Sequence, residues 1–162
     1  MSLARHHGGF VILLSFGTAM LLTIVPLSDG VRSFRPDWVA LTLIFWSLVL
    51  PYRVSVGSGF LAGLLLDVLT GTLLGQHALA LSLVAYLCVR LHLRIRAYPM
   101  WQQSLTVLVL LVLQQLVVLW IDSLIGRPPH PFSYWLPSLV GMVLWPLVYR
   151  ILTALRINFS VS

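Results

Sequence analysis

The chain lacks lysine and glutamate altogether and has few charged residues of any kind. Charged side chains make up 9% of the 162 residues, whereas soluble domains carry about 25%. All ten basic residues are arginine, and the acidic residues are Asp29, Asp37, Asp67 and Asp122. The arginines lie at the ends of apolar runs and form no basic stripe interleaved with aromatic residues. Despite the net charge of +6, we therefore expect no nucleic-acid partner.

Cysteine is scarce, and catalytic motifs are missing. Cys88 is the single cysteine, which excludes an internal disulfide bond, and its apolar surroundings predict a small buried side chain. The sequence contains no nucleophile–base pair, paired carboxylates or glycine-rich phosphate loop. His6-His7 and His92 have no Cys, Asp or Glu at metal-ligand spacing. We expect neither an enzyme nor a bound metal or cofactor.

Apolar residues, by contrast, make up 59% of the chain, and the mean hydropathy is +0.98. Apolar runs near the length that crosses a bilayer, about 17 to 25 residues, predict an all-α membrane protein with a single transmembrane domain over residues 1–162. The six helices of the predicted bundle cover residues 10–27, 37–52, 55–72, 78–93, 100–121 and 134–155. No small-residue cleavage site follows the first run, so we expect it to be a retained helix and not a signal peptide.

The apolar stretch from Val54 to Val89 determines the number of helices. Its 36 residues contain one charged side chain, Asp67. As one helix it would extend about 54 Å, well beyond a hydrocarbon core of about 30 Å. The stretch must therefore fold back on itself, and we predict the break at residues 71–77.

The distribution of the arginines tests the number of helices independently and predicts the orientation of the chain in the membrane. With both termini in the cytoplasm, six helices place most arginines inside, as the positive-inside rule requires. The cytoplasmic arginines are Arg5, Arg53, Arg90, Arg94, Arg96, Arg150 and Arg156, and the external ones are Arg32, Arg35 and Arg127. Five helices would reverse the bias for the group from Arg90 to Arg96. The sequence thus predicts a multi-pass protein with cytoplasmic N- and C-termini.

A spacing of four residues joins Gly59, Gly63, Asp67, Gly71 and Gly75. Residues four apart share a helix face, and small residues there let a second helix approach closely. A carboxylate at membrane depth marks a functional site or needs a partner. Three interpretations of Asp67 stay open: it locks two helices together, it contacts a partner's membrane helix, or it belongs to a proton or ligand pathway. The last is disfavoured because no second titratable group is expected at the same depth.

Gln114 or Gln115 is an internal partner that the sequence suggests for Asp67. Helices 55–72 and 100–121 run in the same direction, so Asp67 and Gln114 are expected at similar depths. Gln103 lies eleven residues before Gln114 and shares its helix face. We expect at least one of these glutamines to hydrogen-bond across helices, an interaction worth about 0.6 and at most about 2 kcal/mol.

Two short segments flank the predicted helices on the external side. In Arg35-Pro36-Asp37-Trp38, the proline is suited to a helix start and Asp37 complements the positive end of the helix. Arg35 and Trp38 also offer an external docking surface. Gln76 and His77 are predicted to lie in the external turn, where a lone histidine indicates polar turn chemistry. Pro146 predicts a kink in the last helix.

These motifs resemble the MreD family of rod shape-determining proteins. The resemblance is carried by Arg35-Pro36-Asp37-Trp38, by the segment from Gly63 to Ala78 that contains Asp67, Gly71, Gly75, Gln76 and His77, and by Trp135-Leu136-Pro137-Ser138. It covers essentially the whole chain in length, helix number and charge layout.

The resemblance implies a place in the bacterial inner membrane, within the cell-elongation machinery. It implies MreC, a bitopic protein, as the direct partner. Actin-like MreB, the SEDS glycosyltransferase and the class B penicillin-binding protein would be indirect partners, and a homodimer is left open. The fold is expected to be similar to the substrate-binding subunits of energy-coupling-factor vitamin transporters, which also have six helices.

These observations lead to two hypotheses of function, which belong to different classes. The first is a non-enzymatic membrane scaffold that maintains rod shape by binding MreC and helping to organise peptidoglycan synthesis. Its expected docking elements are helix 55–72 and the turn at Gln76 and His77. The alternative is a vitamin-like small-molecule binding or transport subunit, which predicts a polar-lined cavity open to the outside near Asp67, Gln76 and Gln114.

Overall fold

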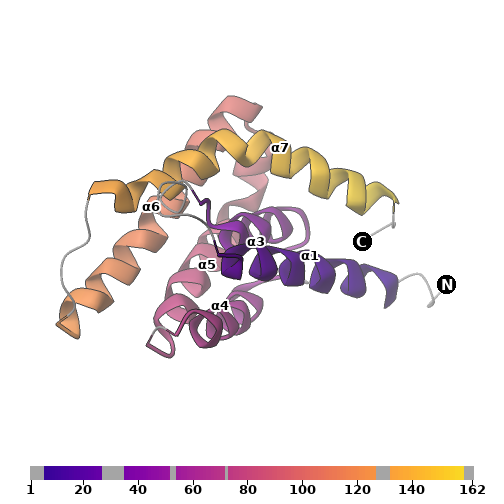
Figure 1. Cartoon of the computed structure of the whole chain (residues 1–162). Coiled ribbons are helices and arrows are strands. Elements are labelled where there is room, and N and C mark those ends of the chain that lie inside the picture. The colour runs from indigo at the N-terminus through magenta and orange to yellow at the C-terminus, as the bar shows by residue number, and fades with distance from the viewer. Residues whose placement is uncertain (1–5, 27–34, 52–53, 72, 127–131, 159–162) are drawn as a thin grey trace.

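The computed structural model describes residues 6–26, 35–51, 54–71, 73–126 and 132–158, and every regular element in these ranges is a helix (Figure 1). The elements are α1 (His6–Ile24), α3 (Trp38–Val49), α4 (Val56–Thr70), α5 (Gln76–Ala97), α6 (Met100–Leu124), the 3-10 helix η2 (Phe132–Trp135) and α7 (Leu136–Asn158). The predicted all-α architecture with six α-helices is confirmed, and each boundary lies within four residues of its predicted position. Arg5, Arg32, Arg53 and Arg127, which the orientation argument used, lie outside the described ranges, and so does Asp29.

The six helices differ in length. α5, α6 and α7 have 22, 25 and 23 residues and are long and apolar enough to cross a membrane. The apolar helices Gly9–Ile24, Trp38–Val49 and Val56–Thr70 are shorter. The chain is therefore a multi-pass membrane protein by its apolar helices, and the crossing of the bilayer by all six stays a prediction.

Helix α3 occupies the interior of the bundle. Every residue from Val39 to Val49 is buried, and α3 packs against α1, α5, α6 and α7. Its twelve residues span only about 18 Å, less than a hydrocarbon core of about 30 Å. The backbone beyond its ends is covered by protein, since Pro36, Leu50 and Val54 are buried. Non-helical backbone at membrane depth is tolerated where protein surrounds it.

Helices α4 and α5 form the hairpin that the length of the Val54–Val89 stretch requires. They make the most extensive helix pair of the structure, and Gly59 and Gly63 lie at their interface. A Cβ atom on Gly63 would lie 2.3 Å from the Cα of Ala78, and one on Gly59 would lie 2.8 Å from the carbonyl oxygen of Leu81. The two glycines therefore serve helix packing inside the chain, as the small-residue pattern predicts.

Gly71 and Gly75 have a different role from the one predicted. α4 ends at Thr70, so the two glycines are not on its face, and a Cβ atom on either would have no neighbour within 4 Å. Their φ angles are 70° and 99°, values that a residue without a side chain adopts at no steric cost. They turn the chain between the two helices, and the prediction of a packing motif at Gly71 and Gly75 was wrong.

The beginning of α1 and the end of α7 lie on the same side of the molecule (Figure 1). This arrangement agrees with an even number of crossings, although the side of the membrane on which these ends lie stays a prediction. α7 continues as one helix through Pro146, and its ribbon bends near the middle (Figure 1). Large apolar side chains such as Leu13, Leu61 and Val143 are 71%, 63% and 71% exposed, as expected of surfaces that face lipid.

Candidate functional site

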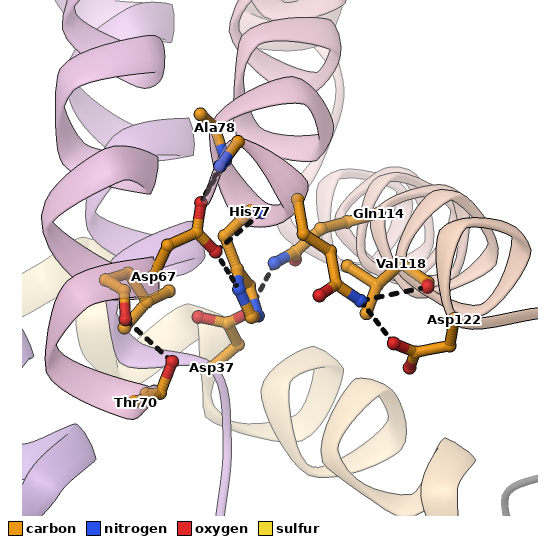
Figure 2. A network of polar contacts seen from close by, with 11 residues as sticks. Asp37, Asp67, Thr70, His77, Ala78, Gln114, Val118 and Asp122 are labelled. Atoms are coloured by element: carbon orange, nitrogen blue, oxygen red, sulfur yellow. Dashed lines mark hydrogen bonds and ion pairs between the residues drawn. The ribbon is translucent and has the colours of Figure 1, made fainter. Parts of the chain in front are cut away.

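The carboxylate of Asp67 caps the start of α5 (Figure 2). Its Oδ2 accepts hydrogen bonds from the backbone N–H groups of Gly75 at 2.9 Å and Ala78 at 3.4 Å, and its Oδ1 accepts one from the N–H of His77 at 2.9 Å. The first N–H groups of a helix have no partner within the helix, and the helix dipole favours an anion there. Because Asp67 comes from α4 and is 1% exposed, this geometry is that of a carboxylate locking two helices of the chain together.

The side chain of His77 adds a further contact to Asp67. Its Nδ1 lies 2.8 Å from Oδ1 of the carboxylate (Figure 2). The expectation that no second titratable group lies at the depth of Asp67 was wrong. The hairpin turn brings His77 back towards α4, so a residue ten positions away in sequence becomes a neighbour. A proton pathway was disfavoured because no second titratable group was expected beside Asp67, and this contact removes that reason.

Gln114 extends from α6 to the start of α3 instead of to Asp67. Its Nε2 donates to Oδ2 of Asp37 at 2.6 Å, and the N–H of Ala40 donates to Oδ1 of Asp37 at 3.1 Å. Asp37 therefore caps α3, as predicted, and also receives the glutamine. A hydrogen bond from Gln114 across helices is confirmed, whereas the predicted pairing of Gln114 with Asp67 was wrong because the N–H groups of α5 bind that carboxylate.

Gln103 makes a second polar connection near the other end of α6. Its Nε2 donates to the carbonyl oxygen of Ile95 at 3.1 Å, and Nε1 of Trp145 donates to its Oε1 at 3.2 Å. Gln103 and Gln114 are 4% and 2% exposed. Both therefore face the interior of the bundle, as their spacing predicts.

Gln76 connects α5 to α6. It is the first residue of α5 and is 1% exposed, so it lies inside the bundle and not in a surface turn as predicted. Its Nε2 donates to Oδ1 of Asp122 at 2.7 Å and to the carbonyl oxygen of Val118 at 3.1 Å. Asp122, which lies one residue beyond the predicted helix 100–121, is part of α6 and is 4% exposed.

Gln115 connects α6 to the beginning of α7. Its Nε2 donates to the carbonyl oxygen of Tyr134 at 2.7 Å, and its own carbonyl oxygen accepts from the Tyr134 hydroxyl at 3.1 Å. The hydroxyl of Ser138 donates to Oε1 of Gln115. This hydrogen bonding explains why two glutamines stand side by side in an apolar helix: Gln114 faces α3 and Gln115 faces α7.

Arg35 and Trp38 lie at the border between α1 and α3. The guanidinium of Arg35 donates to the carbonyl oxygens of Thr23 and Val25 at the end of α1, where the last carbonyls of a helix lack partners. Trp38 is the first residue of α3 and packs against the core. Pro36 precedes the capping Asp37, so the helix begins two residues later than the proline. Docking of an external partner by Arg35 and Trp38 stays a prediction.

Two acidic side chains make the electrostatic environment around Tyr134 negative. Burial raises the pKa of the Tyr134 hydroxyl well above its usual value, and the charges of Asp122 and Asp37 raise that pKa further. The phenol therefore stays protonated and available as a hydrogen-bond donor at neutral pH.

These polar groups surround a cavity of about 340 Å³ beside the segment that precedes α3 and between α4, α5, α6, η2 and α7, which we call the polar cavity. Its polar lining includes Arg35, Asp37, Gln76, His77, Gln114, Gln115, Asp122, Tyr134 and Ser138. A cavity lined in part by polar side chains lies near Gln76 and Gln114, as the small-molecule hypothesis requires, but Asp67, which that hypothesis also placed there, is not among its lining residues. Among the described residues, no three His, Cys, Asp or Glu side chains are grouped as metal ligands.

The polar cavity brings together Arg35, Gln76, His77, Gln114 and Gln115 from the predicted set, and it adds Asp37, Asp122, Tyr134 and Ser138. Gly59 and Gly63 lie along the hairpin instead, and Trp38 lies on another face of α3. Asp122 could have been recognised from the sequence, because Gln114, Val118 and Asp122 are four apart and share one face of α6. Tyr134 and Ser138 carried no such signal.

Comparison with known proteins gives one consistent result. A family model described as rod shape-determining protein MreD matches residues 4–155. The chain is 32% identical over 147 residues to the rod shape-determining protein MreD of Haemophilus influenzae, covering 91% of each chain. No solved structure matches the chain.

Proposed function

Since the chain belongs to the MreD family of rod shape-determining proteins, we propose that it is a non-enzymatic scaffold that binds the membrane helix of MreC. By holding MreC in the bacterial inner membrane, it would help to organise peptidoglycan synthesis by the SEDS glycosyltransferase and the class B penicillin-binding protein, together with MreB. Its termini would face the cytoplasm. The observation that supports this proposal most directly is a helix-sized groove on the outside of the bundle.

This apolar groove lies between α1, α3 and α7 and has a volume of about 800 Å³. On α1 it extends from Phe10 to Leu22, a length of about 18 Å. The other walls are Trp38 and Thr42 of α3 and residues 148–155 of α7, among them Val148 and Leu152. An apolar groove of this length can receive about three turns of a transmembrane helix.

The wall of the groove on α1 has short side chains that leave room for a partner helix. Thr18 is exposed there, whereas Ala19 is 4% exposed and Ser15 accepts a hydrogen bond from Nε1 of Trp46, so these two small residues already pack against α3. The hydroxyls of Ser15 and Thr18 donate to carbonyl oxygens of their own helix, at 2.7 and 2.9 Å. Because both hydroxyls are already hydrogen-bonded, a partner helix can pack against them without supplying polar groups.

The small-residue face of α4 is a weaker docking site, because Gly59 and Gly63 already pack against α5. A charged substitution at Gly63 would disturb the hairpin itself, so loss of MreC would not identify a docking face. If α4 contributes to docking, it would do so through its opposite face, where Leu61 and Leu65 are 63% and 55% exposed.

The experiment is co-purification of MreC with the tagged full chain from membranes. Thr18→Trp would fill the groove, and we expect it to reduce the recovered MreC at least about tenfold, corresponding to about 1.4 kcal/mol. Leu13→Trp is the matched control, since Leu13 is on the same helix, is 71% exposed and does not line the groove. Equal recovery with both variants would overturn docking in this groove.

A further inference from the structure

One exposed face of α5 changes from apolar to basic along its length. It consists of residues that follow one another at intervals of three or four and therefore share a face of the helix: Leu79, Leu83, Tyr86, Arg90 and Arg94. All five side chains are exposed, so α3, α4 and α6, against which α5 packs, leave this face uncovered. We call these five residues the α5 stripe. Because α5 is long and apolar enough to cross a membrane, the α5 stripe is a surface that meets lipid.

The apolar part of the α5 stripe has the length of one leaflet. Leu79 lies eleven residues before Arg90, which corresponds to about 17 Å along the helix. One leaflet contributes about half of a hydrocarbon core of about 30 Å. A phospholipid whose phosphate lies at Arg90 can therefore lay an acyl chain along Leu83 and Tyr86 as far as Leu79.

The two arginines of the α5 stripe have no acidic partner in the described part of the chain. The described carboxylates line or adjoin the polar cavity at the start of α5, and they belong to Asp37, Asp67 and Asp122. From Gln76, the first residue of α5, to Arg90 is about 21 Å along the helix. Charges in solution are screened over about 8 Å at physiological ionic strength. These carboxylates therefore do not neutralise Arg90 and Arg94, and an anion from outside the chain can do so.

A contact inside the α5 stripe holds the charge of Arg90 near the apolar part. The guanidinium carbon of Arg90 lies 5.9 Å from the centre of the Tyr86 ring, a distance typical of a cation–π interaction. Tyr86 is one turn earlier, so the guanidinium lies back along the helix, towards Leu83. The dipole of α5 stabilises Arg94, in its last turn, but this effect does not extend as far as Arg90.

Two unfavourable terms follow from this geometry. An unpaired charge at the edge of the hydrocarbon core is costly, and like charges four residues apart on a helix repel each other. A phosphate between Arg90 and Arg94 removes both terms. Guanidinium groups also suit this ligand, because their N–H donors match the geometry of phosphate oxygens.

We propose that the α5 stripe binds one anionic phospholipid. Its phosphate accepts hydrogen bonds from Arg90 and Arg94, and an acyl chain lies along the apolar part of the stripe. A zwitterionic phospholipid is a poorer ligand, because the two arginines repel its cationic group. α5 does not line the apolar groove, so this site is independent of the docking of MreC.

Phosphatidylglycerol is the probe, and phosphatidylcholine is the reference lipid because it has the same phosphate diester with no net charge. The purified full chain is placed in phosphatidylcholine nanodiscs that contain increasing fractions of phosphatidylglycerol, and thermal unfolding is followed by tryptophan fluorescence. We expect the unfolding temperature to rise and to saturate. An equal response to both lipids would leave the arginines to an acidic protein and would overturn the lipid site.

Inorganic phosphate separates a lipid from a free anion. Added to phosphatidylcholine nanodiscs, it should give no saturable stabilisation, because it has no acyl chain to lie on the apolar part of the α5 stripe. Stabilisation equal to that by phosphatidylglycerol would show a site for free phosphate and would overturn the proposal.

Three single variants test whether the α5 stripe, and not the overall charge, binds the lipid. Arg90→Gln and Arg94→Gln should each raise the half-saturating fraction of phosphatidylglycerol at least about fivefold, corresponding to about 1 kcal/mol. Arg96→Gln is the matched control, since Arg96 is exposed in the same last turn but lies two residues beyond Arg94, on another side of the helix. It removes the same charge and should leave the half-saturating fraction unchanged. Equal shifts in all three variants would reflect a general attraction of a basic chain to an anionic membrane, and would overturn the site.

Discussion

The polar cavity and the apolar groove are both hollows beside α3, but they are held open by different forces. Side-chain hydrogen bonds from Gln76, Gln114 and Gln115 connect the helices around the polar cavity. In the apolar groove, the hydroxyls of Thr18 and Thr42 bond within their own helices, and only Ser15 among these three hydroxyls receives a hydrogen bond from another helix. The cavity is thus bounded mainly by hydrogen bonds between helices, and the groove mainly by apolar packing. Perturbing the two regions should therefore give different results.

The hairpin that supports the polar cavity should be the most sensitive element. Gly63→Leu places a side chain into the backbone of Ala78, 2.3 Å from the position of the new Cβ. Backbone cannot move aside as a flexible side chain does, so the cost should exceed the roughly 1–3 kcal/mol of ordinary overpacking. We expect little or no folded protein in size-exclusion chromatography.

Gly57→Leu is the control for this variant, because a Cβ on Gly57 of the same helix meets nothing within 4 Å. It should be recovered in normal amounts. Normal recovery of Gly63→Leu would contradict the close approach of α4 and α5.

Asp67→Asn should give the next largest effect. An amide has one acceptor oxygen where the carboxylate has two, so N–H groups at the start of α5 lose their acceptor. Hydrogen bonds to charged groups are worth about 1.5–3 kcal/mol each, and we expect a loss of about 2–4 kcal/mol in thermal unfolding. Ser82→Ala, which removes only a hydrogen bond to the carbonyl oxygen of Ala78 in the same helix, should cost less than about 0.5 kcal/mol. Equal losses would contradict the capping role.

The apolar groove should respond more weakly to loss of a hydrogen bond. Ser15 accepts a 2.8 Å hydrogen bond from Nε1 of Trp46, a residue of α3 that is fully buried. Ser15→Ala leaves this N–H without an acceptor, at a cost of about 1–2 kcal/mol. Hydrogen exchange should also increase in α1, because the bond joins α1 to α3. Thr18→Val removes a hydroxyl bonded within its own helix and should change neither measurement appreciably.

Tyr134→Phe should have the smallest effect of the series. It removes the 3.1 Å hydrogen bond to the carbonyl oxygen of Gln115, worth about 0.5–1.5 kcal/mol. Tyr86→Phe, on an exposed part of α5, should be neutral in the same unfolding measurement. If the two variants lose equal stability, the hydroxyl of Tyr134 does not hold α6 to η2.

The helices and their order could be predicted from the sequence because apolar length is a strong constraint. The Val54–Val89 stretch cannot be one helix in a bilayer, and the glycines show where it turns. The enclosure of α3 was harder to anticipate, since a helix that faces lipid and one that faces protein are equally apolar. Amino-acid composition alone therefore does not distinguish a helix that faces lipid from one that is enclosed by protein.

The polar cavity could be predicted only in part. The sequence indicated that Asp67 and the glutamines bond across helices, but matching depth along parallel helices led to the wrong pairs. Hydrogen-bond partners depend on helix rotation and on where each helix starts, and periodicity specifies neither closely. His77 became a partner of Asp67 because α5 begins at Gln76, two residues earlier than predicted.

The burial of α3 also bears on how the protein is made. A twelve-residue segment emerging from the ribosome is too short to span the bilayer stably by itself. The helices that enclose it on two sides, α5 and α7, are synthesised later. If α3 crosses the bilayer as predicted, its retention there would depend on segments synthesised after it, and insertion and folding of this protein would be coupled.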